Sequence, residues 1–505
     1  MQVEPAAEVF TQLYKQGQAQ VVWTTLVADL ETPVSAFLKI AAAKPMSFLL
    51  ESVEGGAVRG RYSIIGLDPD VVWRANGTGA EVNRNPAAAS ANFVAWDAPP
   101  LTALREFVAE SRVDLPDSLP PMAAGLFGYL GYDMVRVMED LPAPNPDPIG
   151  IPDAILVRPT VVVIFDAVKD TVTVVTPVRP ANGVSADAAF ARAVERITAV
   201  IDDLDRPLHQ EAAIQVDGPL NSPATSNTSA DEFHRMVRKG KEYIAAGDIF
   251  QVVLAQRFET PFTLPPFALY RALRRVNPAP FLFYLDYGTF AVAGSSPEIL
   301  VRVREGTVTI RPVAGTRPRG ATPHEDKALE EELLADPKEC AEHLMLLDLG
   351  RNDVGRVAKI GSVEVTDQFF IERFSQVMHI VSNVEGALDA RYDALDALVA
   401  GFPAGTVSGA PKVRAMQIID ELEKERRGLY AGCVGYFSAA GDLDSCIVLR
   451  TALVKDGHMY VQAGAGIVAD SDPASEQQEC INKAKALFRA AEEARRFASA
   501  ASRGQ

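Results

Sequence analysis

Residues 281–293 read Phe281-Leu-Phe-Tyr-Leu-Asp-Tyr-Gly288-Thr-Phe-Ala-Val-Ala293, two β-rich runs that meet at one glycine. Aromatic and β-branched residues favour strands, and glycine suits the tight turn between them. Such a short connection forces the two strands to pair antiparallel. The next two runs, Ile299–Arg304 and Thr307–Val313, are expected to repeat this hairpin around Glu305-Gly306.

Further β-rich runs and helical patterns alternate along the C-terminal half of the chain. Strands are expected at Tyr430–Ser438, Ser445–Val454 and His458–Val468, and helices near 325–335, 337–349, 410–424 and 473–498. The last-but-one helix is expected to begin at Pro411. Helices that alternate with antiparallel hairpins must cover the faces of the sheets. We therefore predict an α+β protein whose large antiparallel β-sheets pack as a sandwich with helices on the outside.

The N-terminal part is also expected to mix α and β structure. A hairpin is expected at Val161–Phe165 and Val172–Val175, followed by a helix from about Ala188 to Asp203. The stretch Arg206–Thr228 is rich in Pro, Ser, Thr and Asn, which is typical of a linker. Ser229-Ala-Asp-Glu232 then resembles a capping box that opens a helix. We place the main boundary near 225, which divides the chain into regions 1–225 and 226–505.

Composition excludes several classes of function. The 505 residues carry a formal net charge of -17, which argues against a nucleic-acid partner, because such a partner demands a basic surface. No apolar run approaches the roughly 20 residues of a membrane helix, and the N-terminus does not resemble a signal peptide. The four cysteines form no C-x-x-C pair, so a zinc site is not expected. We expect a soluble protein of the reducing cytoplasm.

Two predicted helices begin with Asp-Pro and carry paired glutamates. After Asp336-Pro337, Glu339 and Glu342 share one face, and after Asp472-Pro473, Glu476, Glu479 and Lys483 do the same. Four carboxylates from two helices suit a hard cation such as Mg²⁺. Glutamates in a first helical turn also favour the helix dipole. By spacing alone, that structural interpretation remains the preferred one.

Three other features combine polar chemistry with small or apolar neighbours. The loop Gly405–Lys412 runs into a helix and offers backbone N–H groups to an anion. The strand end Gln462–Gly466 contains two glycines that let a ligand approach the backbone. Arg450 and His379 stand inside apolar runs, where a buried charge needs a partner. Taken singly, each also fits an ordinary turn, ion pair or core histidine.

Taken together, these segments resemble the chorismate-utilising enzyme family. The resemblance covers residues 229–490 and keeps the order of the family's motifs. The matching stretches are Gly294–Glu298, Arg311–Gly320, Asp336–His343, Asp348–Asp353, Gly405–Lys412, Gln462–Gly466 and Glu476–Lys483. Such an ordered series favours the functional interpretation of each segment over the structural one.

The resemblance implies a chorismate site with bound Mg²⁺. It assigns the ion to Glu342 and Glu479, with Glu339 and Glu476 in support. Glu298 would protonate the departing C4 hydroxyl, and this role requires a pKa raised by burial. His379 would serve the later loss of pyruvate. The remaining substrate contacts that the resemblance implies are Arg450, Tyr430, Gly464, Gly466, Gly315, Thr316, Thr406 and Lys483.

Two positions indicate the branch of the family. Members that add water to chorismate carry a lysine base where this chain has Gln251, and many aminodeoxychorismate synthases carry a lysine where it has Ala314. Glutamine cannot deprotonate water, so ammonia fits better as the nucleophile. The resemblance thus favours the large subunits of anthranilate synthases. An aminodeoxychorismate or aminodeoxyisochorismate synthase, or a tryptophan-sensing subunit without activity, remains the alternative.

The resemblance also implies regulation and a partner. Leu49–Ser52 and Asn277–Phe281 are similar to two segments that form the tryptophan feedback site of anthranilate synthases. The residues expected there are Glu51, Ser52, Asn277, Pro278, Pro280, Phe281, Tyr436 and Cys446. No glutaminase motif surrounds any cysteine, so ammonia is expected from a separate glutamine amidotransferase subunit.

Overall fold

The computed structural model describes residues 2–54, 58–88, 92–208, 224–374 and 377–498. Most of the linker expected at Arg206–Thr228 lies outside these ranges. All strand pairings within them are antiparallel, and the α+β sandwich with external helices is confirmed. None of the described helices is both long and apolar enough to cross a membrane.

Two long strands, β3 (Val58–Asn76) and β7 (Ala154–Asp166), pair with each other and connect the two sheets. One sheet continues from β3 through β2 (Ser47–Glu54), β11 (Phe281–Asp286), β12 (Phe290–Ser296), β21 (Thr451–Lys455), β22 (His458–Ile467) and β10 (Gln251–Pro261). The other continues from β7 through β6 (Gly125–Leu130), β19 (Cys433–Ser438), β20 (Leu443–Ile447), β13 (Ile299–Arg304), β14 (Thr307–Ile310) and β17 (Val377–Ala387). Shorter or flanking strands are β1 (Gln20–Val27), β4 (Gly79–Asn83), β5 (Val94–Trp96), β8 (Thr171–Val178), β9 (Thr225–Ser226), β15 (Val313–Pro318), β16 (Glu364–Arg373) and β18 (Gly409–Ala410).

A buried core joins the facing sides of the two sheets. Phe48 of β2 stacks on Phe127 of β6 with ring centroids 4.6 Å apart, and Phe127 in turn contacts Tyr436 of β19 at 5.6 Å. All three rings are buried, and aromatic pairs at such distances stabilise a core beyond the apolar area that they bury. This layer holds the two sheets face to face.

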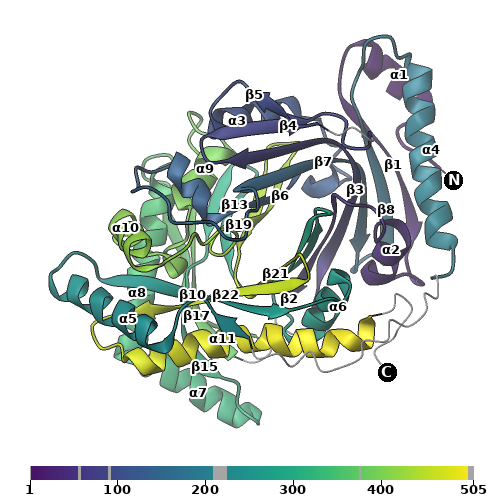
Figure 1. Cartoon of the computed structure of the whole chain (residues 1–505). Coiled ribbons are helices and arrows are strands. Elements are labelled where there is room, and N and C mark those ends of the chain that lie inside the picture. The colour runs from purple at the N-terminus through teal and green to yellow at the C-terminus, as the bar shows by residue number, and fades with distance from the viewer. Residues whose placement is uncertain (1, 55–57, 89–91, 209–223, 375–376, 499–505) are drawn as a thin grey trace.

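Helices cover the outer faces of both sheets (Figure 1). Over the first sheet lie α1 (Ala7–Lys15), α2 (Pro33–Ile40), α4 (Ala186–Asp205), α5 (Ala230–Ala245), α6 (Pro266–Val276), α10 (Lys412–Leu422) and α11 (Pro473–Glu493). Over the second lie α3 (Pro100–Glu110), α7 (Pro323–Ala335), α8 (Pro337–Gly355) and α9 (Ala394–Gly401). The predicted capping box at Ser229–Glu232 and the Asp caps of α8 and α11 are present, so these three helices begin where the sequence indicates.

Three predicted strands are wrong in their limits, each for a local reason. The strand expected at Thr307–Val313 breaks into β14 and β15 around Pro312, which has no N–H to donate. The strand expected at Ser445–Val454 breaks into β20 and β21, because Arg450 adopts a left-handed conformation with φ 48°. β19 begins at Cys433 and not at Tyr430, because Ala431 is left-handed as well. The helix expected from Pro411 begins at Lys412, with Pro411 as its cap.

The boundary near 225 stays a prediction. Strand pairing crosses it twice, because β2 pairs with β11 and β6 pairs with β19. The two sequence regions therefore share both sheets of the sandwich, and each contributes strands to the core between them.

Candidate functional site

The four glutamates predicted to hold a metal approach one another between α8 and α11. Burial raises the pKa of Glu342, and the negative charges of Glu339 and Glu479 raise it further. Burial likewise raises the pKa of Glu476, with Glu479 again adding to the effect. Like charges on two helices thus act on one another across a small space.

Two cations offset part of this negative charge. Arg317 contacts Glu339 at 3.1 Å, and Lys483 contacts Glu479 at 2.8 Å while donating to the Gly464 carbonyl at 2.9 Å. Within the described ranges, no three His, Cys, Asp or Glu side chains converge closely enough to hold an ion as they stand. The oxygen donors, together with the raised pKa values of Glu342 and Glu476, nevertheless fit Mg²⁺, because a hard cation would relieve the repulsion.

Gln251 joins this carboxylate group to the glycines of β22. Its Nε2 donates to Glu342 Oε1 at 3.0 Å, while its Oε1 is buried and has no partner among the described residues. A Cβ added at Gly466 would lie 2.6 Å from that Nε2, and one at Gly464 would lie 2.8 Å from the Tyr430 hydroxyl. Only glycine at these two positions of β22 leaves room for the side chains of Gln251 and Tyr430.

Glu298 lies just beyond the end of β12 and is buried. Burial raises its pKa to about 8, although the Thr406 hydroxyl, which donates to Oε1 at 3.1 Å, and the Arg450 charge both lower it. The rise that the family role requires is therefore present. This carboxyl group is protonated at neutral pH and can donate a proton.

Arg450 is largely buried, and its guanidinium has no hydrogen bond or ion pair with any residue that the structure describes. Burial lowers its pKa, and Glu298 is the charge that opposes this. A buried guanidinium without a carboxylate partner suits an anionic ligand, which it can hold through two parallel bonds.

His379 lies on β17 opposite the bulge in β15 at Gly315. Its Nδ1 is 2.9 Å from the Gly315 carbonyl oxygen and 3.1 Å from the Thr316 hydroxyl. A carbonyl only accepts, so the proton is on Nδ1, and Nε2 remains an acceptor without a hydrogen bond to any described residue. Burial lowers the pKa of His379 to about 4, with Arg450 and Lys483 adding to the effect. The ring is neutral at physiological pH.

The predicted catalytic, substrate and metal residues thus form one connected group. A Cβ added at Gly315 would lie 3.2 Å from Glu339, which places the His379 side of the group beside the metal side. Sequence reasoning gave no role to Arg317 or to the buried ion pair between Asp353 and Lys412, whose atoms are 2.8 Å apart. Each of these three residues lies in a matched motif, but its charge alone does not indicate which residue it contacts.

A cavity of about 520 Å³ lies between the sheets, close to the Glu298 segment. Six of the residues predicted for a tryptophan site line it, namely Glu51, Ser52, Pro280, Phe281, Tyr436 and Cys446. Asn277 and Pro278 do not belong to its lining, although the amide nitrogen of Asn277 is buried and unpartnered in the described structure. Glu51 is engaged by Tyr270 at 2.5 Å and by Arg274 at 2.7 Å. A volume of this size suits a small-molecule ligand.

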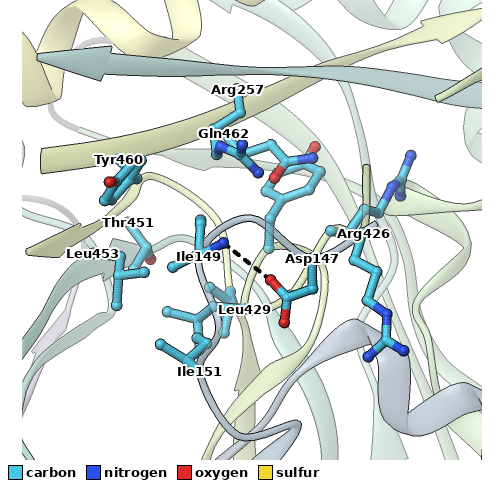
Figure 2. A pocket seen from close by; sticks show the side chains of 14 residues that line it. Asp147, Ile149, Ile151, Arg257, Arg426, Leu429, Thr451, Leu453, Tyr460 and Gln462 are labelled. Carbon is cyan, nitrogen blue, oxygen red and sulfur yellow. Dashed lines mark hydrogen bonds between the residues drawn. The ribbon is translucent and has the colours of Figure 1, made fainter. Parts of the chain in front are cut away.

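A second hollow adjoins Tyr430 but is too small for a substrate (Figure 2). Its volume is about 40 Å³, enough for molecules of the size of water. Figure 2 shows Arg257, Arg426 and Gln462 around it, with Asp147 accepting a bond from the Ile149 N–H at 3.2 Å. Of the residues predicted to bind chorismate, Tyr430 lines it and the others do not.

Comparisons with known proteins show the family of this chain. The sequence pattern of the family described as chorismate binding enzyme matches residues 61–489. The chain is 56% identical to anthranilate synthase component 1 of Cereibacter sphaeroides, over 98% of this chain and 99% of that protein. It is 47% identical to the protein of the same name from Pseudomonas putida, over 92% and 93% of the two chains.

Solved structures are similar along almost the whole chain. The crystal structure of anthranilate synthase component I from Streptococcus pneumoniae superposes with a TM-score of 0.73 and 36% identity, covering 92% of this chain and 98% of that one. The menaquinone-specific isochorismate synthase of Escherichia coli superposes with a TM-score of 0.70 at 20% identity, covering 96% and 98%. The second similarity shows the fold alone.

Proposed function

The chain belongs to the chorismate binding enzyme family and, within it, to the anthranilate synthase component 1 proteins, and we propose that it converts chorismate and ammonia to anthranilate, pyruvate and water. The observation that carries the proposal is Glu298, a buried carboxyl whose pKa is raised to about 8. Glu298 and Arg450 affect each other's pKa, so they lie close together, and the Arg450 guanidinium is available to bind an anion. Substrate anchoring and proton donation are thus adjacent.

The residues act in a definite order in this proposal. Arg450, Tyr430 and the Gly464 backbone hold the enolpyruvyl carboxylate, and Glu298 gives its proton to the C4 hydroxyl, which leaves as water while nitrogen adds at C2. His379, neutral and with Nε2 as an acceptor, then takes the proton from C2 as the bond from C3 to the enolpyruvyl oxygen breaks, and this proton passes to the methylene carbon of the enolpyruvyl group, which leaves as pyruvate. The proton that the added ammonia loses restores Glu298 to its acid form.

Mg²⁺ is the ion that the glutamates fit. Glu342 and Glu479 would hold it directly, and Glu339 and Glu476 would support them. When bound, it supplies charge neutralisation at the ring carboxylate and polarises the ring for substitution.

Gln251 is the residue that favours ammonia over water. Its amide cannot act as a base, and its bond to Glu342 keeps it beside the carboxylates. Ammonia needs no deprotonation before it attacks, so an amide suffices at this position. We propose that a glutamine amidotransferase subunit delivers the ammonia in the cell.

We further propose that L-tryptophan binds in the 520 Å³ cavity and inhibits the enzyme. Six predicted residues from segments far apart in the sequence line this one space, which supports a built site rather than a packing defect. Calorimetric titration with tryptophan, and with phenylalanine and tyrosine as controls, tests the ligand. Failure of tryptophan to bind would remove the feedback proposal but not the proposed chemistry.

Product analysis tests the chemistry. Incubation with chorismate, ammonium and Mg²⁺ is expected to yield fluorescent anthranilate and pyruvate in equal amounts. Accumulation of an aminated intermediate without pyruvate would favour an aminodeoxychorismate or aminodeoxyisochorismate synthase. Tryptophan binding without chorismate consumption would favour the sensing subunit.

A further inference from the structure

The strand end Gly294–Glu298 lies between the predicted tryptophan cavity and the substrate site. β12 pairs on one edge with β11, where Leu282 faces Ser295, and on the other edge with β21, where Thr451 faces Gly294. The cavity-facing strand and the strand that follows Arg450 therefore both bond to the same few residues.

Ser295 makes one bond toward each side. Its hydroxyl donates to the Asn277 carbonyl at 2.5 Å, and its N–H donates to the Arg450 carbonyl at 3.2 Å. The side chain is fully buried, so water cannot replace either bond. One residue thus connects the chain that enters β11 to the backbone of Arg450, a predicted substrate contact.

The backbone conformation of Arg450 depends on its surroundings, which include the bond from Ser295. Its φ of 48° is left-handed, a conformation that residues with a Cβ disfavour and that the surroundings must hold. The neighbouring strand leaves little freedom, because a Cβ at Gly294 would lie 2.1 Å from the Phe283 ring and 2.6 Å from the Thr451 hydroxyl. A shift of β11 therefore has to move Ser295, and with it the carbonyl of Arg450.

The next residues along the segment reach the cavity directly. Pro297 and Glu298 line it, and Cys446, another lining residue, hydrogen-bonds Ser296. A ligand in the cavity thus touches the segment that carries the proton donor as well as the segment that holds Arg450.

We propose that Ser295 is a positioning residue that couples the occupancy of the cavity to the setting of Arg450, an inference that rests on the proposed function. Tryptophan, by engaging β11 and the Pro297–Glu298 wall, displaces Ser295 and turns Arg450 away from the geometry that grips the enolpyruvyl carboxylate. Inhibition then appears as weaker chorismate binding. By reciprocity, chorismate weakens tryptophan binding by the same factor.

Ser295→Ala tests the coupling, because it removes the hydroxyl link to Asn277 and keeps the N–H bond to Arg450. Calorimetry gives the tryptophan Kd, and ammonia-dependent kinetics give the ratio of apparent chorismate KM with and without saturating tryptophan. Each variant is compared with its own KM without tryptophan. We expect the tryptophan Kd to stay within about 3-fold and the KM ratio to fall by about 5-fold or more. Ser295→Cys, which places a weaker and larger donor at the same position, should give an intermediate ratio.

Ser438→Ala is the matched control. This serine is also buried, and its hydroxyl donates to the Pro121 carbonyl at 2.6 Å, although neither residue lines the cavity or contacts Arg450. It should keep the wild-type ratio. A wild-type ratio in Ser295→Ala, or a loss of tryptophan binding in it, would overturn the assignment of Ser295 as a coupling residue. If wild-type protein does not bind tryptophan, the proposed feedback site falls and the coupling falls with it.

Discussion

The Thr406 hydroxyl donates a hydrogen bond to Glu298 Oε1 at 3.1 Å, and this bond opposes the burial that raises the pKa of Glu298 to about 8. The loop that carries Thr406 therefore tunes the predicted proton donor. Burial alone would place the pKa higher, and a stronger donor at the position of Thr406 would lower it. The balance keeps the carboxyl protonated yet able to release its proton.

Thr406→Val should move the pH dependence of catalysis. Loss of the bond destabilises the carboxylate, so the pKa of Glu298 rises. The alkaline fall in kcat/KM, which we expect near pH 8 in the wild type, therefore moves to higher pH. The measurement is the ammonia-dependent rate across pH at a fixed concentration of free ammonia. Glu298→Gln, which has no ionisable group there, should lose about 10²- to 10⁴-fold in kcat and the limb with it. If the alkaline fall in kcat/KM stays at the same pH in Thr406→Val, it does not report the titration of Glu298.

The raised pKa of Glu298 also makes stability depend on pH. The folded pKa of about 8 exceeds the ordinary value of 4.5, so the contribution of this group to stability is complete below about pH 4.5 and is lost as pH rises through 8. Glu298→Gln removes that loss. Its Tm relative to the wild type should therefore increase between pH 5 and pH 9. Glu492→Gln, an exposed change on α11, should leave the difference flat across this range.

Much of this architecture could be predicted because its signals are local. The Glu305-Gly306 hairpin and the Asp336-Pro337 helix start are written in neighbouring residues, and both are present. Arg450 shows the opposite case: its left-handed backbone ends a strand that its β-rich neighbours favour, and the contact with Ser295 lies 155 residues away in the sequence. Tertiary contacts override local preference at such a place.

In the site, too, local sequence predicts some features, and tertiary contacts determine the others. Helical spacing places Glu339 and Glu342 on one face, but it cannot reveal that Arg317 neutralises the first or that Gln251 bonds the second. Motif order supplied the residues, whereas their protonation depends on burial. The pKa values of Glu298 and His379, one raised and one lowered, come from the fold as a whole.

Mg²⁺ binding should be measurable without turnover. An ion that binds the folded protein raises its Tm, and millimolar Mg²⁺ should do so in the wild type. Glu342→Gln should abolish this rise and the activity, while keeping a cooperative unfolding transition. Glu492→Gln serves again as the control, since it lies farther along α11. A normal Mg²⁺ response in Glu342→Gln would remove Glu342 from the metal site.

The ion pair between Asp353 and Lys412 should stabilise the junction of α8 with the loop that carries Thr406. Both side chains are buried, so Lys412→Met leaves an uncompensated carboxylate and should cost about 3–5 kcal/mol of unfolding free energy. Denaturant titration measures this cost. The double variant Asp353→Asn with Lys412→Met should recover part of it, because no buried charge remains. A single variant as stable as the wild type would contradict the burial of the pair.

The amination of chorismate is tested most directly by one assay, in which purified protein receives chorismate, ammonium and Mg²⁺ and both products are quantified. Anthranilate and pyruvate should form together in equal amounts, and Glu298→Gln should lose both. Chorismate that is consumed to a hydroxylated or aminated compound without pyruvate, or is not consumed at all, would contradict the proposed function.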